Sequence, residues 1–388
     1  MPEGQNQVFA SSGKINIAFI IDTIQSPTAG TEKQLVFLLK QLNREKFNPF
    51  LCVLQSSEWL EKEFSICPLF IAGIDSLKQV KSWRGIISLV HFLKKQRISV
   101  VQTFFEDANR IGILTASLAG IRTIISSKRN QGYFTTKPAN TLKRALNKKV
   151  SLFIANSRST KDWVVRAEMI PAEKVEVIYN GLDPELFVPL TEEERLEYKG
   201  RSMLSVEASI VGIIANLRSV KGIDVFIRAA EKVFQEWPQV EFLIVGDGPE
   251  RKNLEDLVRE LGMAENIKFL GQLSDVLRIL KIMDIGVLSS SSESFSNSLL
   301  EYMAAGLPVV STNVGGLNEA LRHGEGGYFI PVGDHEAMAR SILSLITNPE
   351  KSLAMGRYNR EIIIKDFNKE QFVLAHEQVY EKLLSRNQ

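Results

Sequence analysis

Short apolar runs alternate with amphipathic stretches along the first half of the chain. The apolar runs are rich in β-branched residues and are bounded by polar or turn-forming residues, which is typical of buried strands. They predict strands at residues 15–21, 50–54, 100–104, 123–126, 152–155 and 175–179. Helical periodicity predicts helices at residues 31–42, 86–96, 109–119 and 160–167. Because parallel neighbours need long crossover connections, this alternation favours a parallel sheet covered by helices.

The pattern breaks in the middle of the chain and then starts again. A turn-forming cluster at 180–184 precedes a charged stretch without strand character at 191–201. Further strands are predicted at 210–215, 240–245, 267–270, 285–288 and 308–311, with helices at 223–237, 251–261 and 298–305. Two doubly wound units of this kind bind ligands at the carboxyl edges of their sheets, in a cleft between them.

We therefore expect an α/β protein with four segments. Residues 1–185 form an N-terminal Rossmann-like domain, and residues 186–205 form a linker. Residues 206–368 form a C-terminal Rossmann-like domain, and residues 369–388 form a helix that packs back on the N-terminal domain.

Size and composition agree with two soluble domains. A chain of 388 residues exceeds the size at which a single core stops growing, and 44% hydrophobic content is ordinary for a globular protein. No run approaches the roughly 18 apolar residues that span a bilayer, and the N-terminus lacks a secretory signal pattern. The two cysteines, Cys52 and Cys67, lack metal-binding spacing and fit a reducing compartment. We expect a cytoplasmic protein.

The net charge of +2 conceals an asymmetry. Residues 1–186 carry 25 basic against 16 acidic side chains, and residues 108–161 include eleven basic residues and no acidic one. This stretch includes Arg122, Lys128, Arg129, Lys137, Lys143, Arg144, Lys148 and Lys149. It indicates an anionic partner, either an acidic acceptor or an anionic membrane surface at the inner leaflet contacted by a helix at 142–150. The alternative is a solvated basic face that aids solubility.

The clearest candidate site is the segment at 290–308, SSSESFSNSLLEYMAAGLP. A strand ends in serines, Glu293 follows in a loop, and a helix begins near Ser296, Asn297 and Ser298. Free N–H groups and the dipole at a helix start can hold a phosphate, and carboxylates such as Glu293 and Glu301 can accept the hydroxyls of a diol. The alternative for Glu301 is a capping box with Ser298, in which it serves only the helix.

A second candidate element lies at 215–222, just after the first strand of the second domain. Arg218 and Lys221 stand three residues apart there, a spacing that suits a diphosphate leaving group. The alternative is an ordinary surface turn. Gly246 and Gly248 also follow a strand, but the third glycine of a dinucleotide fingerprint would fall at Arg251, so that fingerprint fails.

In the first domain, Gly30 lies between a predicted strand and helix, where a glycine would let the backbone approach a phosphate or an acceptor. The polar residues near the predicted strand ends are further candidates for the acceptor side, although most residues of this kind cap helices. They are Asp22, Glu106, Asp107, Asn109 and Arg129.

These motifs together resemble the retaining glycosyltransferases of family 4. Glu293 and Glu301 have that family's E-x7-E spacing, and the continuations AAGLPVV at 304–310 and GGLNE at 315–319 resemble its nucleotide-sugar signature. The resemblance implies a GT-B fold and a nucleotide-sugar donor, with no metal or other cofactor required. It also implies that Glu293 binds the donor sugar, Glu301 binds the ribose and Lys221 clamps the diphosphate.

The resemblance extends to further residues and has departures. It implies that Gly246, Gly271 and Gln272 lie near the nucleotide, although these positions also fit tight turns. Asn216 stands where a common family form has arginine, and Arg218 matches a variant placement. Ala29 replaces a glycine, and Gln102 and Phe104 occupy a segment that carries histidines in many relatives.

We expect transfer of a hexosyl unit from a UDP-sugar, or alternatively a GDP- or ADP-sugar, to an acceptor hydroxyl, with Glu293, Arg218 and Lys221 as the catalytic residues. The resemblance implies retention of configuration. One alternative is a sugar-nucleotide 2-epimerase, and another is an inactive partner that only binds nucleotide sugar. A nucleic-acid binder is disfavoured, because the basic stretch has few interleaved aromatics and no recognised module.

Overall fold

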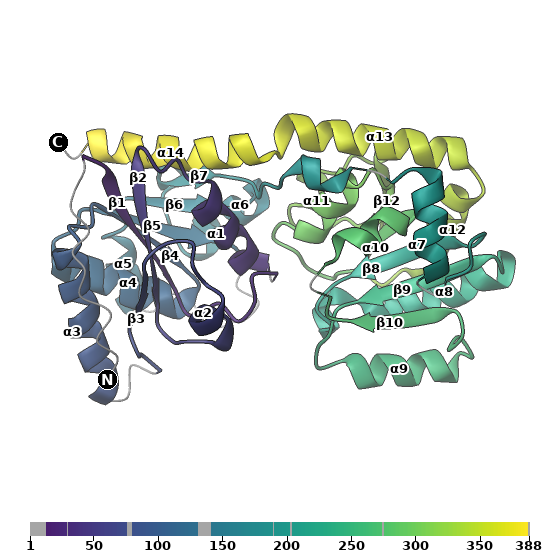
Figure 1. Cartoon of the computed structure of the whole chain (residues 1–388), viewed down its shortest axis with the longest axis horizontal. Coiled ribbons are helices and arrows are strands. Elements are labelled where there is room, and N and C mark those ends of the chain that lie inside the picture. Colours follow the sequence, from purple (N-terminus) through teal and green to yellow (C-terminus); the bar gives the residue numbers. More distant parts are fainter. Residues whose placement is uncertain are drawn as a thin grey trace. The chain divides into compact units, whose positions relative to one another are not determined.

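The computed structural model of the chain describes residues 13–28, 30–75, 80–130, 141–188, 190–201, 204–273 and 275–386. The chain divides into two compact units (Figure 1). Unit 1 comprises Met1–Asn180 and Glu370–Gln388, and unit 2 comprises Gly181–Lys369. The chain therefore passes from one unit to the other twice, and each unit has its own sheet and core.

Unit 1 contains a seven-stranded sheet in the order β3-β2-β1-β4-β5-β6-β7, in which every paired strand is parallel. The strands are β1 (Ile15–Ile21), β2 (Phe47–Val53), β3 (Leu69–Ile71), β4 (Val100–Phe104), β5 (Thr123–Lys128), β6 (Leu152–Ala155) and β7 (Val175–Val177). The helices are α1 (Gly30–Gln41), α2 (Glu58–Lys62), α3 (Val80–Lys95), α4 (Glu106–Ala119), α5 (Thr141–Asn147) and α6 (Arg158–Ala167). The strand order reverses between β1 and β4, the position at which such sheets bind ligands beyond their carboxyl ends.

The last helix of the chain, α14 (Lys369–Ser385), supplies core residues to unit 1. Its apolar face buries Phe372, Tyr380 and Leu383 in the same core as β1 and β2. The Tyr380 hydroxyl donates to Oε1 of the buried Gln102 on β4 at 2.5 Å. Gln102 thus links α14 to the sheet.

Unit 2 contains a six-stranded parallel sheet in the order β10-β9-β8-β11-β12-β13. The strands are β8 (Ser209–Ile214), β9 (Val240–Val245), β10 (Ile267–Gly271), β11 (Ile285–Leu288), β12 (Val309–Thr312) and β13 (Gly327–Ile330). The helices are α7 (Glu192–Arg201), α8 (Ile223–Glu236), α9 (Arg251–Glu260), α10 (Leu277–Ile282), α11 (Asn297–Ala304), α12 (His335–Ile346) and α13 (Pro349–Asp366). Here the strand order reverses between β8 and β11.

The expected fold class is confirmed, because both units are Rossmann-like α/β layers. The segment at 186–205 differs from the linker that we expected, since it contains α7 and belongs to unit 2. Arg195 donates to Oδ1 of Asp284 at 2.5 Å, and the Lys199 ammonium donates to the Ala208 carbonyl at 2.8 Å. Charged residues therefore attach this stretch to the body of unit 2. Within the described ranges, no helix has both the length and the apolar character needed to cross a membrane.

Candidate active site

Three loops meet at the carboxyl ends of β8, β11 and β12 in unit 2, and they comprise residues 215–222, 289–296 and 313–316. Two glycines allow the loops to pack backbone against backbone. A Cβ on Gly222 (φ +60°) would lie 2.4 Å from the Ser289 carbonyl oxygen, and one on Gly315 (φ +57°) would lie 1.5 Å from the Glu293 carbonyl oxygen. Both glycines also have left-handed backbone conformations that other residues rarely adopt.

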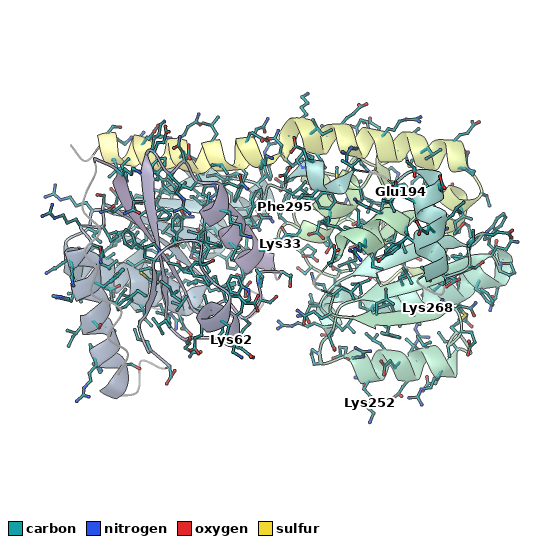
Figure 2. The ribbon with its side chains drawn as sticks, in the orientation of Figure 1. Lys33, Lys62, Glu194, Lys252, Lys268 and Phe295 are labelled. Atoms are coloured by element: carbon teal, nitrogen blue, oxygen red, sulfur yellow. The ribbon has the colours of Figure 1, made fainter. Side chains whose placement is uncertain are left out.

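Hydrogen bonds join the same loops. Two of them join the loops 289–296 and 215–222: the Ser289 hydroxyl donates to the Lys221 carbonyl at 2.8 Å, and Ser291 N donates to the Val220 carbonyl at 2.9 Å. Two more join loop 289–296 to the end of β12 and the loop after it: the Thr312 hydroxyl donates to the Ser290 carbonyl at 2.6 Å, and Gly316 N donates to the Ser294 carbonyl at 3.0 Å. Phe295, labelled in Figure 2, is buried, and its ring centroid lies 5.7 Å from that of Phe367, just beyond α13. The loop that carries Glu293 is therefore held from several sides.

The structure brings Glu293 and Lys221 together, as an ion pair between Glu293 Oε1 and the Lys221 ammonium. The Ser290 hydroxyl donates to the same carboxylate oxygen at 2.9 Å. The Glu293 side chain is only 10% exposed, whereas the Lys221 side chain is 25% exposed. The site thus holds a buried carboxylate, which accepts hydrogen bonds, beside a more accessible cation that suits phosphate.

Helix α11 begins at this loop cluster, and its cap differs from the capping box that we considered. Ser296 is the N-cap, and its hydroxyl accepts from Leu299 N at 3.3 Å. Ser298 lies inside the helix and donates its hydroxyl to the Ile214 carbonyl at 2.8 Å, so this hydroxyl fastens α11 to β8. Glu301 is the fifth helical residue and is 7% exposed, so the capping-box interpretation of Glu301 is wrong. Asn297 is the first residue of the helix.

No sequence motif singled out Tyr302, which lies on the buried face of α11. Ile214 N donates to the Tyr302 hydroxyl at 2.7 Å, and this hydroxyl donates to the Val287 carbonyl at 3.3 Å. The ring occupies the space in which a Cβ on Gly286 would clash, at 2.5 Å. Tyr302 therefore holds α11 against the ends of β8 and β11, and complete burial raises the pKa of its phenol.

The other donor-side candidates lie around the same sheet edge. Arg218 is exposed and precedes the 3₁₀ turn η3 (Ser219–Lys221). Gly246 N donates to the Gly271 carbonyl at 2.8 Å, and a Cβ on Gly246 would lie 2.0 Å from the Ala215 carbonyl oxygen. Close packing thus accounts for Gly246, as in the tight-turn interpretation. Gln272 is exposed.

Unit 1 has a cavity of about 270 Å³ near the carboxyl ends of β1, β4 and β5. Four of the acceptor-side candidates line it: Asp22, Glu106, Asn109 and Arg129. Lining residues that the sequence did not single out for this site include Arg110, Trp163 and Glu168.

Two of the candidates lie apart from this cavity lining. Asp107 is largely exposed and forms an ion pair with Arg110 at 3.7 Å. Gly30 has no left-handed backbone, and a Cβ there would meet no atom within 4 Å. Neither conformation nor packing therefore requires a glycine at position 30.

Asp22 caps a helix and lies in an unfavourable place for a charge. Its Oδ1 accepts from Ala108 N at 2.7 Å, in the first turn of α4. Burial raises its pKa to about 6 despite the opposing hydrogen bond from Ala108, and the nearby carboxylates Asp107, Glu32 and Glu106 raise it further. Asn109 is held by the sheet, because its Oδ1 accepts from the hydroxyls of Thr103 at 2.5 Å and Ser126 at 2.8 Å.

Part of the basic stretch is consumed by internal ion pairs. Glu168 contacts Lys128 at 2.7 Å and Lys143 at 3.0 Å, and the Lys128 and Glu168 side chains are 10% and 6% exposed. Burial lowers the pKa of Lys128 despite the adjacent Glu168. The Lys128 and Lys143 side chains thus point inward, which corrects their assignment to an outer basic contact. Arg122, Arg144, Lys148 and Lys149 are exposed, and Lys137 lies outside the described residues.

Solved structures with this two-unit architecture are GT-B glycosyltransferases. HepE of Anabaena, solved in complex with UDP, matches with a TM-score of 0.81 over 96% of this chain and 100% of HepE, at 22% identity. At that identity the likeness shows the fold alone. A family model described as "Glycosyl transferases group 1" matches residues 195–362, and one described as "Glycosyltransferase Family 4" matches residues 28–186. The chain belongs to the family 4-like, group 1 glycosyltransferases, and the resemblance noted in the sequence is confirmed.

Curated relatives agree with this family. N-acetyl-alpha-D-glucosaminyl L-malate synthase of Bacillus anthracis is 32% identical over 214 residues, which cover 55% of each chain. UDP-Gal:alpha-D-GlcNAc-diphosphoundecaprenol alpha-1,3-galactosyltransferase of Escherichia coli is 24% identical over 304 residues, covering 76% of this chain and 78% of the relative. The chain spans about half the length of the first curated relatives that it matches.

Proposed function

We propose that this protein transfers a sugar from a nucleotide-diphosphate sugar, a UDP-sugar, to an acceptor hydroxyl with retention of configuration, in polysaccharide, lipid-linked glycan or glycolipid synthesis. The observation that carries the proposal is the Lys221–Glu293 pair beside the start of α11. A cation, a buried carboxylate and a helix N-terminus are the groups that a sugar diphosphate needs. The names of relatives support the donor class, since HepE was solved with UDP-glucose and the Escherichia coli relative is named for UDP-Gal.

In this proposal the donor replaces the ion pair between Lys221 and Glu293 when it binds. The diphosphate takes the exposed Lys221, together with Arg218, and the buried Glu293 then accepts hydroxyls of the donor sugar in place of the ammonium. The Ser290 hydroxyl keeps Glu293 oriented during the exchange, and Glu301 accepts the ribose hydroxyls. Each charge thus keeps a partner in both states, which avoids an unpaired buried carboxylate.

The chemistry requires positioning and charge stabilisation rather than a protein nucleophile. As the glycosidic bond breaks, negative charge grows on the diphosphate, and Lys221 and Arg218 stabilise it. The departing phosphate accepts the proton of the incoming hydroxyl on the same face of the sugar, which retains configuration. The proposal includes no metal or other cofactor, so added chelator should leave the rate unchanged.

The acceptor belongs to the same proposal. Names of relatives include L-malate, inositol 3-phosphate and diphosphoundecaprenol, all of which carry anionic groups. The exposed cations Arg144, Lys148 and Lys149 support contact with an anionic membrane, where a lipid-linked acceptor would lie. Co-sedimentation with vesicles that contain anionic lipid should fall as salt rises, and binding to neutral vesicles alone would contradict this part.

The experiment is a screen for diphosphate release across UDP-, GDP- and ADP-sugars, with and without acceptor extract. Lys221→Ala and Glu293→Ala should each lower turnover on the order of 10²-fold or more. Matched controls are Lys232→Ala and Glu336→Ala, which break a pair of the same chemistry at 2.8 Å elsewhere in unit 2 and should retain activity. Unchanged turnover in both site variants would remove the assignment. Donor consumption without a glycosylated product would instead favour an epimerase, and binding without turnover an inactive partner.

A further inference from the structure

The cavity of unit 1 is lined by four cations whose situations differ. They are Arg110, Lys128, Arg129 and Lys143. Arg110 pairs with Glu106 at 2.5 Å, and Lys128 and Lys143 both pair with Glu168, at 2.7 and 3.0 Å. Each of these three cations therefore has a carboxylate partner in the cavity lining.

Arg129 differs from the other three. Its guanidinium donates through Nη2 to the amide oxygen of Asn180, a neutral partner. Its Nε is buried and has no hydrogen-bond partner among the described residues, and Arg129 forms no ion pair within 4.0 Å there. Burial lowers the pKa of Arg129 to about 10, and the more distant charge of Glu32 only partly offsets this effect. A half-buried guanidinium without a counter-ion is costly, so the site favours an anion.

We propose that Arg129 forms an anion subsite in the unit 1 cavity, which binds the carboxylate or phosphate group of a hydroxyl-bearing acceptor. That the bound anion belongs to an acceptor rests on the proposed function, whereas anion binding at Arg129 requires no catalysis. A guanidinium binds either anion through two parallel N–H groups, and Asn180 holds the Arg129 fork from one side.

The remaining lining restricts the size and polarity of this ligand. A cavity of about 270 Å³ admits a small polar group but not a whole glycan chain. Asp22 lines the same cavity and can accept a hydroxyl, while Trp163 and Leu146 supply apolar walls. A compact hydroxylated group with one anionic end fits these features, with the anion at Arg129 and hydroxyls toward Asp22.

The test uses the full-length protein with Lys221→Ala, which removes the cation of unit 2 that would also attract phosphate. Calorimetric titration measures binding of two probes, inorganic phosphate and succinate. Arg129→Gln should weaken binding of the preferred probe by roughly tenfold or more, the usual effect of losing hydrogen bonds to a charged group. Arg129→Lys keeps the charge but lacks the two parallel N–H groups, so its affinity for the probe should lie between those of the parent and of Arg129→Gln. Arg122→Gln is the matched control, because Arg122 is an exposed cation of the same basic stretch outside this cavity.

Thermal unfolding guards against a folding defect. Arg129→Gln should be no less stable than its parent, since it removes an uncompensated charge, and added probe should stabilise the parent but not this variant. Preference for phosphate or for succinate assigns the anion and supports the subsite in either case. Equal binding in Arg129→Gln and its parent, or no binding of either probe by the parent, would overturn the proposal. Donor turnover in the Glu293→Ala and Lys221→Ala screen reports on the proposed function separately, so each can fail alone.

Discussion

Gly315→Ala is expected to damage the candidate active site more than its stability cost alone would suggest. The substitution has two effects that the structure separates. Position 315 has a left-handed backbone (φ +57°), where a Cβ costs about 1–2 kcal/mol. The same Cβ would also lie 1.5 Å from the Glu293 carbonyl oxygen, far inside the usual contact distance of about 3.5 Å. The loop that carries Glu293 must therefore move by an ångström or more.

Gly333→Ala is the matched control, because Gly333 also has a left-handed backbone (φ +79°) but a Cβ there meets no atom within 4 Å. Urea denaturation should show a loss of about 1–2 kcal/mol for Gly333→Ala and a larger loss for Gly315→Ala. Donor turnover should be unchanged in Gly333→Ala and should fall about 10²-fold in Gly315→Ala, the cost expected for a displacement of about 1 Å. Equal stability and equal turnover in the two variants would refute the argument that Gly315 positions Glu293.

Three further predictions concern unit 1. Glu168→Ala leaves the buried Lys128 without the carboxylate at 2.7 Å and should lower the free energy of unfolding, measured in urea, by about 3–5 kcal/mol. The double variant Lys128→Met/Glu168→Leu should recover most of this stability, and no recovery would contradict the charge explanation. The pKa of Asp22 is raised to about 6, so the folded state binds its proton more tightly than the unfolded state does. The free energy of unfolding of the wild type relative to Asp22→Asn should therefore fall between about pH 4 and pH 6, by at most about 3 kcal/mol because Asp22 is partly exposed. A constant difference across that range would refute the shift. Tyr380→Phe removes the donor to Gln102 Oε1 and should destabilise the protein by about 1–3 kcal/mol. An unchanged midpoint of unfolding in urea would show that this oxygen finds another donor.

The sequence predicted the strands well where they are buried along most of their length. The strands β1, β4, β6, β9 and β11 have the predicted bounds, because a buried strand reads as a mostly apolar run between polar or turn-forming residues. The strands β3 and β13 were missed, since each is only partly buried at the edge of its sheet. The segment at 192–201 was missed as a helix, because its charged side chains gave no apolar face to detect.

The candidate residues of unit 2 could also be predicted, but their relations could not. Local motifs singled out Glu293, Glu301 and Lys221, and they were expected to lie at one edge of the sheet because loops after parallel strands meet there. The pairing of Lys221 with Glu293 joins residues far apart in the chain. The same holds for the backbone contact of Gly315 with Glu293 and for the hydroxyl of Tyr302 between two strand ends.

Unit 1 shows most clearly what the tertiary structure alone decided. Counting charges predicted a basic surface, yet Lys128 and Lys143 turn inward to Glu168, and Arg129 lines the cavity with no ion pair to any carboxylate that the structure describes. The sequence determined the alternation of strands and helices, because burial imposes a period that can be detected within one segment. Which charges meet depends on distances between segments, and only the folded sheet brings those segments together.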